Sequence, residues 1–253
     1  MKKFYSMLAV LTALSLTSYA SIAYDDSLDA AYDSGWNGGE NGGYGFNPWT
    51  LSSASAGTYI ESPSRGSTGF RQWSEGWGNS AATRTFASAL SAGDTFSIDL
   101  GHFGGNDGEL GISLISGAST VYNVKISAGA SYWQAWDGGN YDLNGFPPGA
   151  LGTGMADYYT TDNDTATFSF TYNGGNSYGM SLVDSSDNGF TFSEHNAGND
   201  ISSITGVVIY NNGQGSGKNF YVDQLSIIPE PATIGLLGFV GSSLVWFRKR
   251  FAA

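Results

Sequence analysis

Apolar and polar side chains alternate in many short segments of the chain, and no long segment has a helical period. In DTFSIDL, for example, Phe96, Ile98 and Leu100 alternate with polar residues. Successive side chains of a β-strand point to opposite faces, so each such segment predicts a strand with one buried face. The other segments of this kind are GISLI, TVYNVKI, TATFSFTY, SYGMSLV, GFTFS, ITGVVIY and NFYVDQLSII. In the last segment the apolar face switches between Val222 and Leu225, which predicts a β-bulge or burial on both faces.

Turn residues separate these segments. Asn173-Gly174, Asn188-Gly189 and Asn212-Gly213 are hairpin signals, because Asn and Gly tolerate the positive φ angles of tight turns. Residues 165–193 are therefore predicted to form a meander of three strands. About ten short strands at this spacing predict an all-β fold, an antiparallel β-sandwich of the jelly-roll type.

The composition agrees with a fold that is rich in turns. Of the 253 residues, 37 are Gly and none is Cys. The segment YDSGWNGGENGGYGFNPWTL is predicted to be a loop with one short strand near residues 49–51. Because no disulfide or thiolate metal site can form, stability must come from the core or from a structural metal ion.

Charge is distributed unevenly along the chain, whose net charge is −12. Five of the ten basic residues lie near the two ends. Residues 24–229 contain 21 acidic and five basic side chains, a net charge of −16. Such a surface repels nucleic acid and anionic lipid, so we expect no nucleic-acid partner. It also helps to keep a protein in solution, and it attracts Ca²⁺.

The N-terminal segment MKKFYSMLAVLTALSLTSYASIA has the three parts of a secretory signal peptide. Two lysines precede an apolar run at residues 7–16, which is too short to span a membrane. Small residues follow at the positions that signal peptidase requires, so cleavage is predicted after Ala20 or Ala23. Residues 1–23 are therefore assigned to a signal peptide, and residues 24–228 to the β-sandwich body.

The C-terminal segment, residues 229–253, also has three parts. Pro229, Glu230 and Pro231 hold the chain extended, because proline interrupts both helices and central strands. Residues 232–247 carry no charge and form a predicted transmembrane helix about 24 Å long, slightly shorter than a ~30 Å hydrocarbon core. The basic cluster is a stop signal on the cytoplasmic side. It consists of Arg248, Lys249 and Arg250.

This order of tripeptide, Gly-containing helix and basic cluster closely resembles the PEP-CTERM sorting signal of Gram-negative bacteria. The resemblance covers about 25 residues. It implies that an exosortase, a membrane cysteine enzyme, cleaves an inner-membrane intermediate near the tripeptide. The body is then released or passed to the cell surface and the extracellular polysaccharide matrix. The alternative is a plain single-span membrane anchor.

Tryptophans in or beside Gly-rich segments are the first candidate binding residues. An exposed indole stacks on the apolar face of a sugar, while neighbouring polar groups bind its hydroxyls. The candidates are Trp36, Trp49, Trp73, Trp77, Trp133 and Trp136. In a strand Trp133 and Trp136 point to opposite faces, so at most one joins a given platform. The closing strand FYVDQLSI is similar to that of carbohydrate-binding and lectin-like jelly rolls. The alternative for each Trp is burial in the core.

Acidic turns are candidate Ca²⁺ sites. The segment DGGNYDLNG places oxygen ligands at Asp137, Asn140, Asp142 and Asn144. It departs from the EF-hand pattern, because Leu151 occupies the place of the bidentate Glu. Turns near residues 106–109 and 162–164 are two further candidates, although Asp and Asn are common in turns without any metal.

Enzyme motifs are absent from the sequence. It contains no G-x-S-x-G and no H-E-x-x-H, and His102 and His195 are its only histidines. Several glutamates are present, but none belongs to a close-spaced carboxylate motif. We therefore expect a non-enzymatic exported protein of the cell surface or matrix that binds polysaccharide. The alternatives are a purely structural matrix or adhesion protein and a polysaccharide hydrolase.

Overall fold

The computed structural model describes residues 21–61, 69–103, 108–127, 133–138, 166–184, 189–213 and 219–229. These residues form twelve strands and one short 3₁₀ helix, η1, Ala30–Tyr32. The strands are β1 (Ala23–Asp25), β2 (Thr50–Glu61), β3 (Gly69–Thr85), β4 (Thr95–Phe103), β5 (Glu109–Ser116), β6 (Ser119–Ile126), β7 (Gln134–Trp136), β8 (Ala166–Gly174), β9 (Ser177–Asp184), β10 (Gly189–Asn196), β11 (Gly206–Asn212) and β12 (Asn219–Ile228).

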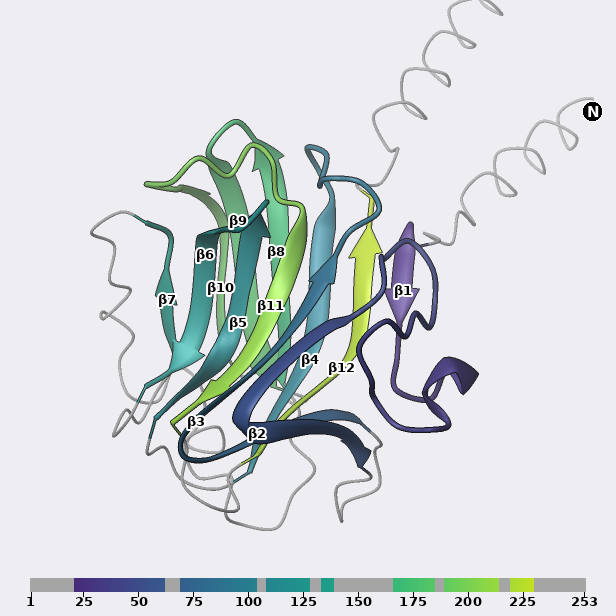
Figure 1. The fold of residues 1–253 in the computed structure, drawn as a ribbon. Coiled ribbons are helices and arrows are strands. Elements are labelled where there is room, and N and C mark those ends of the chain that lie inside the picture. The colour runs from purple at the N-terminus through teal and green to yellow at the C-terminus, as the bar shows by residue number, and fades with distance from the viewer. Residues whose placement is uncertain are drawn as a thin grey trace, which may run out of the picture.

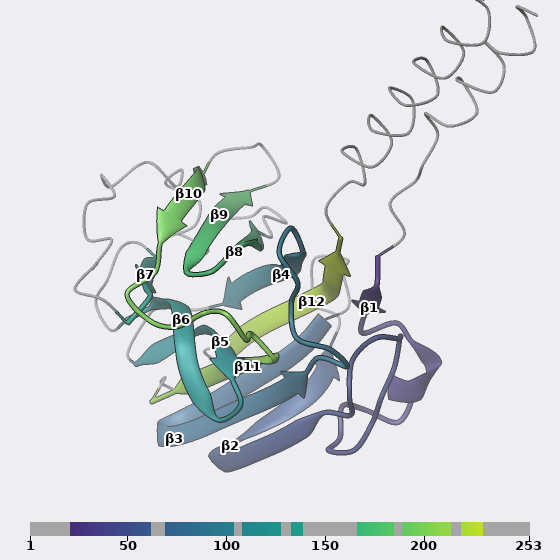
Figure 2. The same ribbon diagram turned by 90° about the horizontal axis from the view of Figure 1, so that it is seen from above.

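The strands form an antiparallel β-sandwich, which confirms the predicted fold class (Figures 1 and 2). One layer contains β10, β9, β8, β4, β12 and β1, and the other contains β2, β3, β11, β5, β6 and β7. The long strand β3 joins the layers. Its first part pairs with β12 at residues 70–73, and its second part pairs with β11 at residues 79–85. The result is a jelly roll whose two layers share a continuous hydrogen-bonded ladder.

The core lies between the layers and is filled by alternate residues of each strand. On β8, Phe168 and Phe170 are fully buried, as the alternation in the sequence predicts. Phe170 stacks on Tyr178 of β9, with ring centroids 4.9 Å apart. Tyr122 of β6 comes from the other layer and lies 5.0 Å from the Phe170 ring. Aromatic contacts of this kind add about 0.5–1.5 kcal/mol each to the hydrophobic term.

Two local predictions are confirmed. Strands β8, β9 and β10 form the meander expected for residues 165–193. In β12 the pairing with β4 shifts between Asp223 and Ser226, and Gln224 has a φ of 50°. This β-bulge explains why Val222 and Leu225 are both buried although they are three residues apart.

One local prediction is wrong. The Asn212-Gly213 pair does not form a hairpin, because β11 and β12 each pair with β3. The segment RQWSEGW lies within β3, so Trp73 is a strand residue. The strand predicted near residues 49–51 is present as the start of β2, although β2 continues to Glu61. Pairing with β2 along both parts of β3 keeps these Gly- and Ser-rich segments extended.

The Gly-rich loop after η1 is held by a buried ion pair. The Arg84 guanidinium lies 2.9 Å from the Asp25 carboxylate, and both side chains are fully buried. Arg84 also donates to the main-chain carbonyls of Glu40 and Gly42, and it lies over the Trp49 ring. Burial raises the pKa of Asp25 to about 6, although the Arg84 guanidinium opposes the rise. The loop is therefore ordered by buried polar contacts as well as by apolar packing.

The two ends of the body lie side by side, because β1 pairs with the end of β12 (Figure 1). Residues 21–23 of the predicted signal peptide are described. Ala23 is buried opposite Ile227, and the Ile22 amide donates to the Ile227 carbonyl. Residues 1–20 and residues 230–253 of the predicted sorting signal lie outside the described residues. Within the described part, no helix has the length and apolar character needed to span a membrane.

Candidate functional site

The outer face of the layer that contains β7 carries polar and aromatic side chains at alternate strand positions. On β6, Val124 lies in the core, so Asn123 and Lys125 on either side of it point outward. On β11, Val207 and Ile209 lie in the core, and the following Tyr210 points outward. Side chains of four neighbouring strands, β11, β5, β6 and β7, therefore meet on one face.

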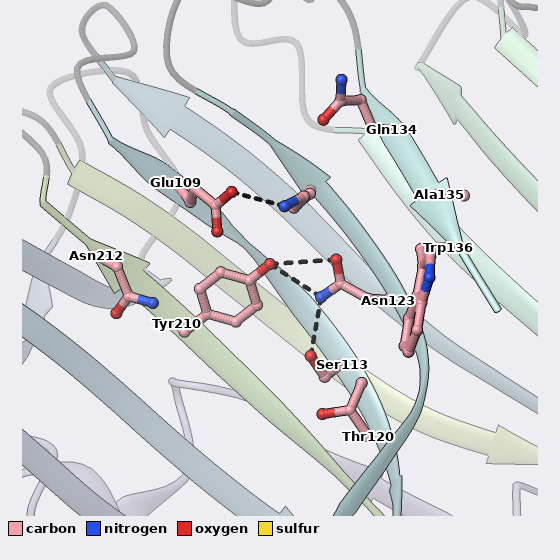
Figure 3. Close-up of a pocket in the computed structure, with 10 residues that line it drawn as sticks. Glu109, Ser113, Thr120, Asn123, Gln134, Ala135, Trp136, Tyr210 and Asn212 are labelled. Carbon is pink, nitrogen blue, oxygen red and sulfur yellow. Dashed lines mark hydrogen bonds and ion pairs between the residues drawn. The ribbon is translucent and has the colours of Figure 1, made fainter. Parts of the chain in front are cut away.

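A cleft of about 570 Å³ opens on this face (Figure 3). Its volume falls within the range of roughly 300–1,000 Å³ that is usual for small-molecule sites. The described residues that line it are Glu109, Ser113, Thr120, Asn123, Lys125, Gln134, Ala135, Trp136, Tyr210 and Asn212. The lining combines two aromatic rings with amide and hydroxyl groups.

The two rings lie on opposite sides of Asn123 (Figure 3). Trp136 belongs to β7 and is opposite Asn123 in the register of β6 and β7. Its side chain is 43% exposed, the largest exposure of any tryptophan among the described residues. Tyr210 comes from β11 on the other side and is half-buried. An indole exposed beside polar groups is suited to stacking on a flat apolar surface.

Hydrogen bonds fix the centre of the cleft. The Asn123 side-chain amide donates to the Ser113 hydroxyl and to the Tyr210 hydroxyl, both at 2.9 Å. It also donates to the main-chain carbonyl of Ile112 at 3.1 Å. Burial raises the pKa of Tyr210 well above its ordinary value. The phenol is therefore neutral at physiological pH and serves as a hydrogen-bonding group.

The two charged residues of the cleft neutralise each other. The Lys125 ammonium donates to the Glu109 carboxylate at 2.6 Å. The other described lining residues are uncharged. Among the described residues, Thr120 and Asn212 make no side-chain hydrogen bond, so their polar groups remain available to a ligand. The cleft can thus bind a molecule that has hydroxyl groups and at least one apolar face.

Contacts from Asp137, the next residue, hold Trp136 in place. The buried Asp137 carboxylate accepts a hydrogen bond from the Tyr178 hydroxyl and lies 3.3 Å from His195 Nε2. The main-chain carbonyl of Asp137 accepts from the Asn199 amide. These contacts attach the short edge strand β7 to β9 and to the chain after β10, so the indole projects from a fixed backbone.

The six candidate tryptophans differ in how far their side chains are exposed. Trp36, Trp49 and Trp133 are buried in the core and cannot stack on a ligand. Trp36 and Trp49 pack on each other and on Phe70. Trp133 is 4% exposed, so of the pair Trp133 and Trp136 only Trp136 reaches the surface. Trp73 is half-buried outside the cleft, and the Trp77 side chain lies outside the described residues.

The predicted calcium ligands are described only in part. Asn140, Asp142 and Asn144 lie outside the described residues, and Asp137 has the protein contacts given above. Among the described residues no cluster of three or more acidic or histidine side chains is placed to hold a metal ion. The calcium hypothesis therefore remains a prediction for the acidic turns of residues 106–109, 137–144 and 162–164.

Sequence analysis did not identify most of the cleft. Trp136 was a candidate and Glu109 belonged to an acidic turn, but Asn123, Lys125 and Tyr210 were not singled out. The signal that identifies them is the outward position in each alternating strand, where an amide, a charge or a tyrosine replaces the usual Ser or Thr. Only the register of β5, β6 and β11 brings these positions together.

No family model and no curated protein sequence matches this chain. Solved structures with a similar fold include the cellulose-induced protein Cip1, at 14% identity and a TM-score of 0.46, over 81% of this chain and 95% of that one. An endo-β-1,4-glucuronan lyase from the fungus Trichoderma reesei matches at 11% identity and 0.45, over 84% and 97%. A legume lectin-like domain from Entamoeba histolytica matches at 10% and 0.43, over 72% and 90%. At TM-scores below 0.5 these similarities carry no functional conclusion.

Proposed function

We propose that this protein binds polysaccharide in the cleft between Trp136 and Tyr210. The observation that carries the proposal is an exposed indole at the side of a cleft lined by amide and hydroxyl groups. A sugar ring has the complementary chemistry, because its C–H face stacks on the indole while its hydroxyl groups bind the polar lining. The buried tryptophans contribute to the fold and not to this site.

We propose further that the cleft binds without catalysis. Hydrolysis of a glycosidic bond commonly uses two carboxyl groups about 5–10 Å apart. Glu109 is the only carboxylate among the described lining residues, and it is paired with Lys125. The raised pKa of Tyr210 also makes its phenol a poor general base near neutral pH.

Replacing Trp136 with Ala should weaken polysaccharide binding by about tenfold or more, because the stacking surface is lost. Affinity electrophoresis in gels that contain single glycans measures this change as recovered mobility. Tyr44→Ala is the matched control, since Tyr44 is 52% exposed but lies outside the cleft. Equal retention of wild type and Trp136→Ala would contradict the assignment of the cleft. Release of new reducing ends during the incubations would overturn the non-catalytic part.

Export and sorting form the second part of the proposal. The sequences of the two ends support secretion through the signal peptide, followed by exosortase processing at the PEP-CTERM tail. The body then reaches the cell surface or the extracellular matrix, where polysaccharide is present. The alternative is a structural or adhesive role without a sugar site. The absence of retention by every member of a broad set of glycans would favour it.

The structure also bears on where the signal peptide ends. Ser21, Ile22 and Ala23 belong to the folded body, since the Ser21 hydroxyl lies 2.8 Å from the Tyr44 hydroxyl and Ala23 pairs with Ile227. Cleavage after Ala23 would remove these contacts, whereas cleavage after Ala20 keeps them. We therefore expect the exported protein to begin at Ser21, as measured by mass spectrometry of its N-terminal peptide. A mature protein that begins at Tyr24 would refute this assignment.

A further inference from the structure

We propose that the cleft selects an extended stretch of uncharged polysaccharide, several sugar units long. This inference rests on the proposed function and specifies the class of ligand. It follows from the charge balance of the cleft and from the shape of the face beyond it. Each of these features comes from side chains on the described strands.

Charge balance is the first argument. A site for an acidic glycan needs a cation that is free to meet the ligand carboxylate. Lys125 is the one cation among the described lining residues, and it forms an ion pair with Glu109, with Nζ and Oε1 2.6 Å apart. The protein as a whole carries a net charge of −12, which repels anionic chains over about one Debye length. The cleft therefore has no net charge, although the protein as a whole is acidic. An uncharged glycan meets no electrostatic repulsion there.

The register of the strands shows how far the face extends. Two rows of outward positions cross all six strands of the layer from β7 to β2. One row contains Trp136, Asn123, Ser113, Val208, Thr83 and Thr50, and the other contains Gln134, Lys125, Gly111, Tyr210, Ala81 and Ser52. With neighbouring strands about 4.8 Å apart, five spacings give a surface about 24 Å long.

Small side chains keep this surface open on the β2 side. Beyond Tyr210 the second row continues with Ala81 and Ser52, and the first row continues with Thr83 and Thr50. All four are exposed or half-buried, so among the described residues none forms a wall.

The surface of β5 beside Tyr210 also carries no side chain. Position 111 is Gly, and a side chain there would collide with the main chain of Val124 and Lys125. A ligand that stacks on Trp136 can therefore continue past Tyr210 across β3 and β2. A single sugar unit would occupy only part of this surface.

The test compares ligands of different length and charge on the same protein by isothermal titration. The probes are glucose, the neutral hexasaccharides of β-1,4-linked glucose, mannose and xylose, and hexagalacturonate, each at low and high salt. We expect at least one neutral hexasaccharide to bind tenfold or more tightly than glucose, and hexagalacturonate to bind more weakly than that hexasaccharide. Tighter binding of hexagalacturonate, or equal binding of glucose and the hexasaccharides, would overturn the inference.

Two charge variants sharpen the test. Glu109→Gln frees Lys125, so the ratio of uronate to neutral affinity should rise about tenfold at low salt and fall back at high salt. Lys125→Gln frees Glu109 and should move the same ratio in the opposite direction. An unchanged ratio in both variants would show that this ion pair does not set the selectivity.

The outcomes also separate this inference from the proposed function. If no glycan binds, or if Trp136→Ala leaves binding unchanged, the proposed function itself fails. If Trp136→Ala weakens binding as expected but the preferred ligand is acidic or a monosaccharide, only the inference about ligand class fails.

Discussion

Replacing Arg84 with methionine is expected to lower the free energy of unfolding by about 3–5 kcal/mol at pH 8, and by clearly less at pH 5. The larger loss arises because removing one partner of a buried ion pair leaves the other as an uncompensated buried charge. Here the residue left behind is Asp25, which is fully buried. Urea unfolding followed by tryptophan fluorescence at several pH values measures the effect.

The sign of the pH dependence follows from the Asp25 carboxyl. Burial already raises its pKa from 3.8 to about 6 in the wild type, and removal of the Arg84 charge raises it further. A group whose pKa is higher in the folded state stabilises that state below its unfolded pKa, and this stabilisation is lost as the pH rises through the folded pKa. The deficit of Arg84→Met relative to wild type should therefore grow from about pH 6 upward.

The double variant Arg84→Met with Asp25→Asn is the matched control. It removes both charges, so it should recover part of the stability at pH 8 and lose the added pH dependence. A deficit of Arg84→Met that is constant from pH 5 to pH 8 would contradict the proposed origin of the loss.

Phe170→Ala is expected to lower the free energy of unfolding by about 3–5 kcal/mol, the usual range for truncating a fully buried phenylalanine. Phe170 is fully buried between the layers and contacts the rings of both Tyr178 and Tyr122. Its removal opens a cavity that strands hydrogen-bonded on both sides cannot close. The measurement is the unfolding free energy in urea.

Phe192→Ala serves as the comparison for this core substitution. Phe192 lies on β10, at the edge of the same layer, and is only partly buried. Phe192→Ala should lower the free energy of unfolding by about a third as much as Phe170→Ala, because less apolar surface leaves the core. Similar losses for the two variants would indicate that the core is not centred on the stack of Phe170 and Tyr178.

Much of the fold was predictable because the alternation of side chains is a local property. The strands around Phe96 and Phe168 and the bulge near Gln224 each follow from a few neighbouring residues. Pairing between distant strands is not local, which explains the error at Asn212-Gly213. That dipeptide has ordinary turn chemistry, but β3 offers pairing positions to both flanking strands.

The site was less predictable, for a related reason. Exposed Trp136 and buried Trp133 occur in one segment, and alternation distinguishes their faces without saying which face is the outer one. Tyr210 and Asn123 are 87 residues apart and meet only through β5. For Trp36 and Trp49 the sequence left burial and exposure open, and their contacts with each other and with Phe70, distant in sequence, are what bury them.

The pairing of β12 determines how the body would carry a mechanical load. A pull on Pro229 along the strand axis enters through residues 225–228, which lie between β1 on one side and β4 on the other. Both ladders would be strained in shear, so several hydrogen bonds would have to rupture together instead of opening one by one. A body attached to a surface through this strand is thus held where several hydrogen bonds share the load, while β7 lies on the opposite side of the sandwich from β1 (Figures 1 and 2).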